Sequence, residues 1–188
     1  MSQTYDINND IEKVLFTKED IDKCVQRVAA QIDNDYPDPN SRLLLLCILK
    51  GSVVFTGDLM RAIKRPVEID FMKVSSYGRS SVSSGTINIM LDLFRKDMET
   101  VDIVIVEDII DSGRTLSYLK KYLEGKNAKS VRCATLLDKP SRREVDFEAD
   151  YTGTVIEDHF VVGYGLDFDE RYRELPYIGI LKPSVYQK

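Results

Sequence analysis

Short apolar runs alternate with amphipathic segments along most of this chain. Continuous apolar runs occupy residues 43–49, 102–106 and 131–137, while residues 67–74 alternate between apolar and polar positions. Continuous runs of this length are typical of parallel strands covered on both faces, and alternation is typical of a strand nearer the edge of a sheet. The pattern therefore predicts four strands of a largely buried sheet.

Three segments between these runs have apolar residues at helical spacing. The first begins after Thr17, with Asp20 three residues later as in a capping box. Its apolar residues share one face, and they are Ile21, Val25, Val28, Ala29 and Ile32. The other two segments cover residues 53–63 and 116–123, the second of which ends before Gly125, a residue typical of helix ends. Strands alternating with helices predict an α/β fold, in which an open, mostly parallel, twisted sheet is flanked by helices.

The chain is predicted to form a single domain over residues 1–188. We expect the N-terminal helix and the C-terminal tail to add a small hood. The Ser- and Gly-rich residues 75–85 predict a long polar loop, and such loops are either functional or disordered. In open α/β sheets ligands bind beyond the carboxyl ends of the strands, so functional residues are expected directly after the apolar runs.

Composition and charge narrow the classes of protein that fit. With 43% hydrophobic and 30% charged residues, the chain is neither disordered nor membrane-embedded, and its longest apolar run is too short to span a bilayer. A net charge of −5 and a pI near 5.0 argue against nucleic-acid binding. The three cysteines have unrelated spacings, which favours core packing over disulfides or metal ligation. The start of the chain lacks the features of a signal peptide, so a cytoplasmic protein without membrane partners is expected.

The segment IVIVEDIIDSGRTL, residues 103–116, carries the most specific chemistry. An apolar strand leads to Glu107 and Asp108, and DSGRT (111–115) then opens a helix. Unpaired N–H groups at a glycine-containing helix N-terminus bind anions, which here indicates a phosphate monoester. The two carboxylates are placed to accept hydrogen bonds from vicinal hydroxyls of a sugar. The run therefore predicts a site for a ribose phosphate.

A structural explanation exists for each residue of that run taken alone. Glu107 and Asp108 are also compatible with ordinary acids at a strand end, and Asp111 or Ser112 with a simple helix N-cap. The whole run is much less compatible with that explanation.

The run VEDIIDSGRTL (106–116) resembles the 5-phosphoribosyl-1-pyrophosphate-binding motif of type I phosphoribosyltransferases, in detail that of the hypoxanthine-guanine branch. The resemblance extends from about residue 14 to residue 181 through further motifs in the family's order: LKGS (49–52), SSYG (75–78), LLDKPSRR (136–143), FVVGYGLD (160–167) and RYRELPYIGIL (171–181). Residues 87–106 depart most from the family pattern. The resemblance implies the type I phosphoribosyltransferase fold.

The resemblance also implies roles for the central motif. Asp111 would be the catalytic carboxylate, a general base at purine N7 as the base attacks C1′ of the ribose. Glu107 and Asp108 would hold the ribose hydroxyls. The phosphate would be bound by the loop that follows, made of Ser112, Gly113, Arg114 and Thr115. The position of Arg114 varies in the family.

Other motifs correspond to the pyrophosphate and to the loop that covers the site. Lys50, Gly51 and Arg173 would meet pyrophosphate, with an unusual peptide before the glycine. Ser76 and Tyr77 would belong to the mobile loop that closes over the reacting centre and excludes water. A plain turn at Lys50 and an ordinary surface arginine at position 173 are the alternatives.

The remaining motifs correspond to the purine and the metal. Lys139 would donate to the purine 6-oxo group, Phe160 would stack on the base, and the main chain of Val161 would read its edge. Asp167 would contact the base region and bind Mg²⁺ together with pyrophosphate, since Mg²⁺ prefers oxygen ligands. A core position is the alternative for Phe160. The single histidine, His159, has no predicted role.

The resemblance implies a Mg²⁺-dependent enzyme of purine salvage that makes IMP or GMP from 5-phosphoribosyl-1-pyrophosphate and hypoxanthine or guanine. Its partners would be these small molecules, and the protein would form a homodimer or homotetramer. Two alternatives stay open: a nucleic-acid-binding regulator on the same fold, and an enzyme acting on another base, above all xanthine. A generic dinucleotide or Walker-type site is excluded because neither glycine motif follows a strand.

Overall fold

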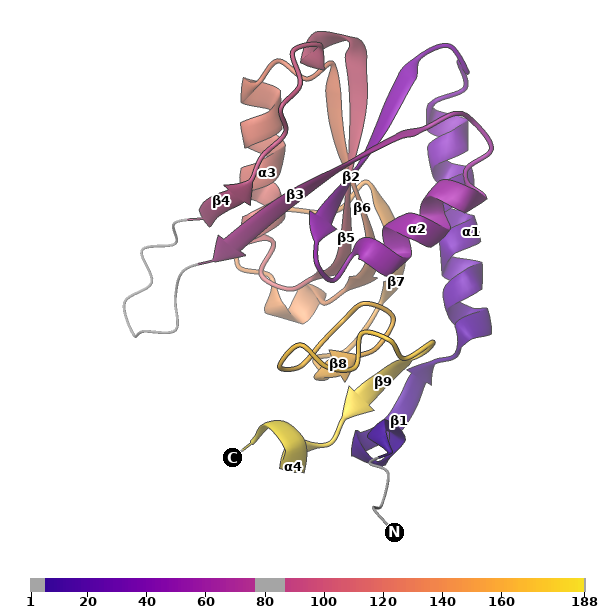
Figure 1. Ribbon diagram of the computed structural model, residues 1–188, viewed down its shortest axis with the longest axis vertical. Coiled ribbons are helices and arrows are strands. Elements are labelled where there is room, and N and C mark those ends of the chain that lie inside the picture. Colours follow the sequence, from indigo (N-terminus) through magenta and orange to yellow (C-terminus); the bar gives the residue numbers. More distant parts are fainter. Residues whose placement is uncertain (1–5, 77–86, 188) are drawn as a thin grey trace.

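The computed structural model describes residues 6–76 and 87–187, which form a main sheet flanked by helices and a smaller sheet at one end (Figure 1). The main sheet has the strand order β4-β3-β2-β5-β6-β7. Its strands are β2 (Arg42–Leu49), β3 (Glu68–Ser76), β4 (Ile87–Leu91), β5 (Val101–Ile110), β6 (Ser130–Asp138) and β7 (Tyr151–Val155). All neighbours pair in parallel except β3 and β4, which pair antiparallel. The predicted α/β class, with its open and mostly parallel sheet, is confirmed.

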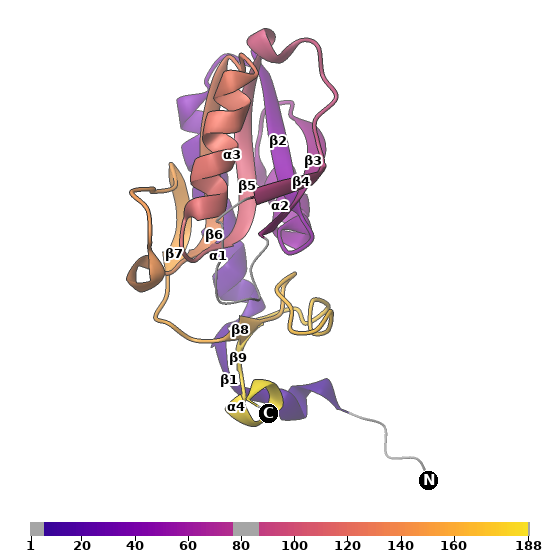
Figure 2. The ribbon, with the colours of Figure 1, turned by 90° about the vertical axis from the view of Figure 1, so that its left-hand side faces the viewer.

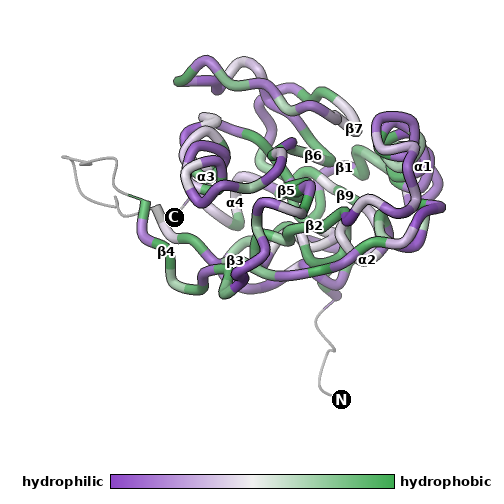
Figure 3. The backbone as a smooth tube through the Cα atoms, turned by 90° about the horizontal axis from the view of Figure 1, so that it is seen from above, coloured by the Kyte–Doolittle hydropathy of each residue, from purple (hydrophilic) through white to green (hydrophobic). Residues whose placement is uncertain are grey.

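Helices cover both faces of the main sheet, and alternate residues of β2 face opposite layers. Leu43 and Leu45 pack with α1 (Lys18–Asp35) and α2 (Val53–Ala62) on one face. Leu44 and Leu46 pack with α3 (Arg114–Gly125) on the other. Seen from above, the largely hydrophobic strands β2 and β5 lie between these helical layers (Figure 3). Burial on both faces explains why these strands are continuous apolar runs.

The smaller sheet forms a hood at the end of the main sheet where both described chain ends lie (Figures 1 and 2). Its order is β1-β9-β8, with antiparallel pairs, and its strands are β1 (Ile11–Phe16), β8 (Val161–Val162) and β9 (Ile178–Leu181). A 3₁₀ turn, η1 (Ile7–Asp10), precedes β1, and the short helix α4 (Pro183–Tyr186) follows β9. The terminal segments therefore do build the predicted hood.

The N-terminal helix, in contrast, was wrongly expected to belong to this hood. Helix α1 packs against α2 and β7 of the main sheet, because its whole predicted apolar face is buried there. Its start agrees with the prediction, since Thr17 and Asp20 form the capping box. The segments near the two ends of the chain that do enter the hood are the strands β1 and β9.

The loop after β5 starts later than the sequence suggests. Strand β5 runs through the two acids to Ile110, because its pairing with β6 continues from Glu107 opposite Thr135 to Ile110 opposite Asp138. The N-cap of α3 is Gly113, whose φ is 77°, and no side chain of the described residues caps this helix. Asp111 is therefore not a helix cap.

Two short 3₁₀ helices, η2 (Met98–Thr100) and η3 (Pro140–Arg142), complete the described chain. All three cysteines are buried and free, as expected for core residues. Within residues 6–76 and 87–187, none of the helices has the length and apolar character needed to cross a membrane.

Candidate active site

Two cavities meet at the carboxyl ends of β5 and β6, and Asp111 lines both. The larger, of about 410 Å³, is lined among others by Lys139, Phe160 and Val161. The smaller, of about 300 Å³, is lined by Glu107 and by residues of the loop between β5 and α3. Ile109 is the other residue shared by both linings. The larger cavity has a size that suits a purine base, and it adjoins the cavity at the predicted phosphate loop.

The smaller cavity contains the start of α3, where N–H groups have no partner within the helix. Ser112, Gly113 and Thr115 line it. Gly113 adopts a left-handed conformation that glycine allows at low cost, and this conformation turns the chain into the helix. The Arg114 N–H lies 3.4 Å from Ser112 Oγ, whereas the Arg114 guanidinium is paired with Glu144 at 2.6 Å, outside this lining. The groups available here to bind an anion are therefore the main chain and two hydroxyls.

Glu107 and Asp108 stand side by side on β5, partly withdrawn from water. Burial raises the pKa of Glu107 well above its usual value, and the neighbouring Asp108 carboxylate raises it further. Burial also raises the pKa of Asp108. A Cβ atom on Gly51 would lie only 1.6 Å from Asp108 Oδ2, so position 51 must be glycine for the turn after β2 to approach this carboxylate.

The two predicted pyrophosphate ligands, Lys50 and Arg173, share one carboxylate. Lys50 Nζ lies 2.8 Å from Glu170 Oε2, and Arg173 Nη2 lies 3.4 Å from the same oxygen. Arg173 also pairs with Asp167 at 2.9 Å and donates to the Gly165 main-chain oxygen at 2.8 Å. The peptide bond between Leu49 and Lys50 is cis, one peptide before the position where an unusual bond was expected. Ion pairs through Glu170 and Arg173 thus bring Lys50, Arg173 and Asp167 together.

Lys139 reaches the larger cavity from the end of β6 and is only 6% exposed. Its Nζ lies 3.6 Å from Asp111 Oδ1 and 3.8 Å from Asp158 Oδ1. Its main-chain N–H donates to Ile110 at 2.9 Å, which holds the start of the segment against β5. The ammonium group is therefore positioned beside Asp111, between two carboxylates.

Aromatic residues and the hood form the remaining wall of the larger cavity. Phe160 stacks on Tyr186 with ring centroids 4.7 Å apart, and both line the cavity. Val161 belongs to β8 and is buried beside them, and Asp167 and His159 complete this side. Phe160 is half-exposed, which fits a platform better than a core position. Tyr77 lies outside the described residues, and Ser76 is the last residue of β3.

Several residues of the site were not predicted from the sequence. Glu170, Asp158, Arg142 and Tyr186 either pair with predicted residues or line the larger cavity. Glu170 and Asp158 stand in charged or polar stretches without periodicity, so nothing local distinguishes them. Arg142 lies within the motif LLDKPSRR, which was the available signal.

A divalent metal would have oxygen ligands here. The described ranges, 6–76 and 87–187, contain no group of three or more His, Cys, Asp or Glu side chains that would enclose an ion. Mg²⁺ is commonly held by one or two carboxylates, with water and substrate phosphates completing its shell. The Asp167 carboxylate, at the rim of the larger cavity beside Arg173, fits such a site.

An open α/β sheet whose central loop joins a phosphate cradle to a base-sized cavity is the architecture of an enzyme that transfers a phosphorylated sugar. The phosphoribosyl transferase domain family matches residues 15–169, most of the chain. The chain therefore belongs to the phosphoribosyl transferase family, in its hypoxanthine-guanine branch. This membership includes the type I fold and a requirement for a divalent metal.

Individual relatives are similar over nearly the full length. A hypoxanthine-guanine phosphoribosyltransferase of Bacillus subtilis is 51% identical over 96% of this chain and 99% of its own. One of Mycobacterium tuberculosis is 49% identical over 95% of this chain and 90% of its own. A crystal structure of a hypoxanthine phosphoribosyltransferase of Staphylococcus aureus superposes with a TM-score of 0.91 at 44% identity, covering 100% of both chains.

Proposed function

We propose that this chain transfers the 5-phosphoribosyl group of 5-phosphoribosyl-1-pyrophosphate to hypoxanthine or guanine, forming the nucleotide and pyrophosphate in purine salvage. One observation carries the proposal: Asp111 lines both the phosphate cradle and the base-sized cavity. A single carboxylate thus faces the position where a base and an activated sugar would meet. The relatives' names support the same reaction.

Asp111 is the group proposed to accept the proton from purine N7 during attack on C1′. A carboxylate performs such proton transfer when it lies within hydrogen-bond reach of the base. Lys139, with Nζ 3.6 Å from Asp111, is placed to donate to the 6-oxo group of the same purine. The 6-amino group of adenine is itself a hydrogen-bond donor and could not accept a hydrogen bond from the Lys139 ammonium group, so this position favours oxopurines.

The sugar phosphate is proposed to bind along β5 and the following loop. Glu107 and Asp108 accept hydrogen bonds from the ribose hydroxyls, and their charge favours the oxocarbenium-like transition state. The N–H groups and hydroxyls of Ser112, Gly113 and Thr115 bind the 5-phosphate at the start of α3. The Arg114 side chain is engaged by Glu144, so the proposal gives its guanidinium no part in phosphate binding.

The leaving pyrophosphate is proposed to bind between Lys50 and Arg173, where it takes the place of the Glu170 carboxylate. The glycine at position 51 allows its main chain to lie against the bound groups. Asp167 would hold Mg²⁺ through oxygen. When bound, this ion neutralises the charge that develops on pyrophosphate.

We also propose that the protein is cytoplasmic and forms a homodimer or homotetramer. Exposed apolar side chains occur on two consecutive elements, α2 and β3, and exposed apolar surface commonly marks an interface. These side chains, here called the apolar patch, are Val53 and Met60 of α2 and Ile69 and Phe71 of β3.

The test is a spectrophotometric assay of the purified protein with 5-phosphoribosyl-1-pyrophosphate and Mg²⁺. Hypoxanthine, guanine, xanthine and adenine are offered in turn, with a matched series in a chelator. Nucleotide formation with hypoxanthine or guanine, absent in the chelator, is expected. Turnover of adenine alone, or binding of 5-phosphoribosyl-1-pyrophosphate without turnover of any base, would contradict the proposal.

A further inference from the structure

Arg143 joins the phosphate loop to the end of β6. Its Nη1 donates to the main-chain oxygen of Asp111 at 2.6 Å, and its Nη2 forms an ion pair with Asp138. The side chains of Arg143 and Asp138 are only 16% and 13% exposed. Hydrogen bonds from a charged guanidinium are shorter and stronger than those between neutral groups. The guanidinium therefore links the residue proposed to be catalytic with a fixed strand end.

The aliphatic part of Arg143 also covers the loop. A Cβ atom on Gly113 would lie 3.0 Å from Arg143 Cδ, so the stem rests directly on the turn that begins α3. The next residue continues the contact, because the Glu144 N–H donates to the Ser112 main-chain oxygen at 3.0 Å. The main chain of residues 111–113 is thus supported at each position by the segment after η3.

The other end of the link lies on a paired strand of the main sheet. Asp138 closes β6 and pairs with Ile110 of β5, directly before Asp111. The Asp138 carboxylate therefore stands on the same pair of strands that carries the loop, and Arg143 spans the short gap between them. Removing the guanidinium would deprive the Asp138 carboxylate of this ion pair and the Asp111 main-chain oxygen of this donor.

We propose that Arg143 is a positioning residue, which holds the loop at residues 111–113 in the conformation that aims the Asp111 carboxylate and the phosphate-binding N–H groups. The inference rests on the proposed function of Asp111 as the general base. A group that reacts only in a narrow range of geometry loses up to about a hundredfold in rate when displaced by about 1 Å. Arg143 itself lines neither of the two cavities of the site, so it acts through the loop.

The test compares Arg143→Met, which keeps the stem and removes the guanidinium, with Arg143→Lys, which keeps the charge. We expect kcat of Arg143→Met to fall about tenfold to a hundredfold and KM for 5-phosphoribosyl-1-pyrophosphate to rise. KM for hypoxanthine should change by less than about twofold, because the Lys139 main chain is held separately by Ile110. Arg143→Lys should recover part of kcat.

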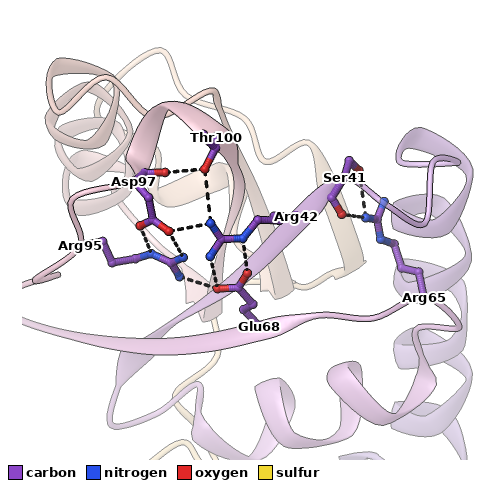
Figure 4. A network of polar contacts seen from close by, with 7 residues as sticks. All are labelled: Ser41, Arg42, Arg65, Glu68, Arg95, Asp97 and Thr100. Carbon is purple, nitrogen blue, oxygen red and sulfur yellow. Dashed lines mark hydrogen bonds and ion pairs between the residues drawn. The ribbon is translucent and has the colours of Figure 1, made fainter.

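Arg65→Met is the matched control. Arg65 also donates to main-chain oxygens, those of Tyr36 and Ser41. Ser41 directly precedes β2, at the end of the sheet opposite the site, and its contact with Arg65 is drawn in Figure 4. Its loss should lower the unfolding temperature and leave kcat and both KM values unchanged. Thermal unfolding of every variant, with assays run well below each midpoint, separates the folded fraction from the rate.

Three outcomes would overturn the inference: unchanged kinetics in Arg143→Met, equal kinetic changes in Arg65→Met, or an equal rise in both KM values with kcat unchanged. If Arg143→Met does not fold, Arg143→Lys decides, and wild-type kinetics there would refute the guanidinium link. Asp111→Asn separates this inference from the proposed function. Full activity of Asp111→Asn would refute the role of Asp111 itself, whereas an inactive Asp111→Asn beside a fully active Arg143→Met would refute only the role of Arg143.

Discussion

At the scale of single residues, the adjacent carboxyl groups of Glu107 and Asp108 are held at a cost in stability. Burial first, and the Asp108 charge second, raise the pKa of Glu107 well above its usual value. The folded protein therefore binds this proton more tightly than the unfolded chain does. The corresponding stability is fully present below the unfolded pKa and is lost as pH rises through the folded pKa.

Glu107→Gln, which cannot ionise, should therefore unfold at a higher temperature than the wild type near neutral and alkaline pH. We expect a midpoint higher by about 2–4 °C at about pH 8, and a smaller difference at about pH 5.5. Thermal unfolding by circular dichroism without substrate measures both. Glu124→Gln, at an exposed position of α3, is the control and should give no such pH-dependent gain. A lower midpoint for Glu107→Gln at both pH values would contradict the prediction.

Asp111→Asn tests the proposed general base. The amide keeps the size of the side chain but cannot accept a proton at neutral pH, so kcat should fall by about a hundredfold or more. The dissociation constant for 5-phosphoribosyl-1-pyrophosphate, measured by calorimetry, should change by less than about threefold, because the phosphate loop keeps its N–H groups. Equal losses in binding and turnover would indicate that Asp111 supports the loop instead.

Much of the candidate site could be predicted from the sequence because its members directly follow apolar strands. Asp111 after β5 and Lys139 after β6 stand where the ends of parallel strands converge. Glu170 and Arg143 could not be assigned in this way. Each acts on a partner far away in sequence, Glu170 on Lys50 and Arg143 on Asp111, and such contacts leave no local pattern.

At the scale of secondary-structure elements, one charged network ties three of them together at the end of the sheet opposite the site (Figure 4). Arg42 at the start of β2 pairs with Glu68 of β3 at 2.7 Å and with Asp97, before η2, at 2.6 Å. Arg95 pairs with the same two carboxylates. Hydrogen bonds from Arg95 and then Arg42 hold the pKa of Asp97 far below its usual value.

Arg42→Met should lower the unfolding midpoint near neutral pH by a few degrees, because two carboxylates lose a shared partner. Since a depressed carboxyl pKa stabilises the fold above the unfolded pKa and this stability is lost as pH falls, the difference should shrink in acid. Calorimetric unfolding at several pH values measures this.

Arg61→Met, which breaks an ion pair with Asp58 within one turn of α2, is the control and should lower the unfolding midpoint by less. Unchanged kcat and KM are expected for both, and a change in KM for Arg42→Met would contradict the assignment of the network to stability alone.

The elements differed in how well the sequence predicted them. Strands β2, β5 and β6 were predicted because burial on both faces makes most of their positions apolar. Strand β1 was missed because none of its residues is fully buried, and β8 because it has only two residues. The misassignment of α1 has a related cause: its apolar face shows that it packs, but not against which layer.

At the scale of the whole molecule, the hood and the main sheet each contribute one wall of the larger cavity. Phe160 and Val161 reach it from the hood, and Asp111 and Lys139 from the main sheet. The chain crosses between the two layers twice, once from β1 into α1 and once from β7 to β8. The shape of the larger cavity, the proposed base site, therefore depends on the position of the hood relative to the main sheet.

At this scale, the exposed apolar side chains of α2 and β3 are the surface through which two copies of the protein are proposed to associate. The apolar patch on α2 and β3 contains Ile69 and Phe71, which are two residues apart on β3 and therefore point to the same face of the sheet. Ile69 is paired with Leu45, which packs under α1 and α2, so this is the face that α2 covers. A second copy that buried this patch would remove these side chains from water. We therefore expect Ile69→Asp combined with Phe71→Asp to give a smaller species, measured by sedimentation velocity.

The matched control for this prediction is Phe94→Asp, which places the same charge on an aromatic residue 90% exposed, after the edge strand β4. Its sedimentation coefficient should equal that of the wild type. If Phe94→Asp dissociates the protein and the double variant on β3 does not, the interface lies at the β4 edge. If the wild type is itself a monomer, the proposed oligomer is wrong.

Dissociation should also affect the kinetics. Helix α2 begins just after the Lys50–Gly51 turn, so a partner that packs on α2 would support this turn. In the dissociated variant KM for 5-phosphoribosyl-1-pyrophosphate should therefore rise more than KM for the base.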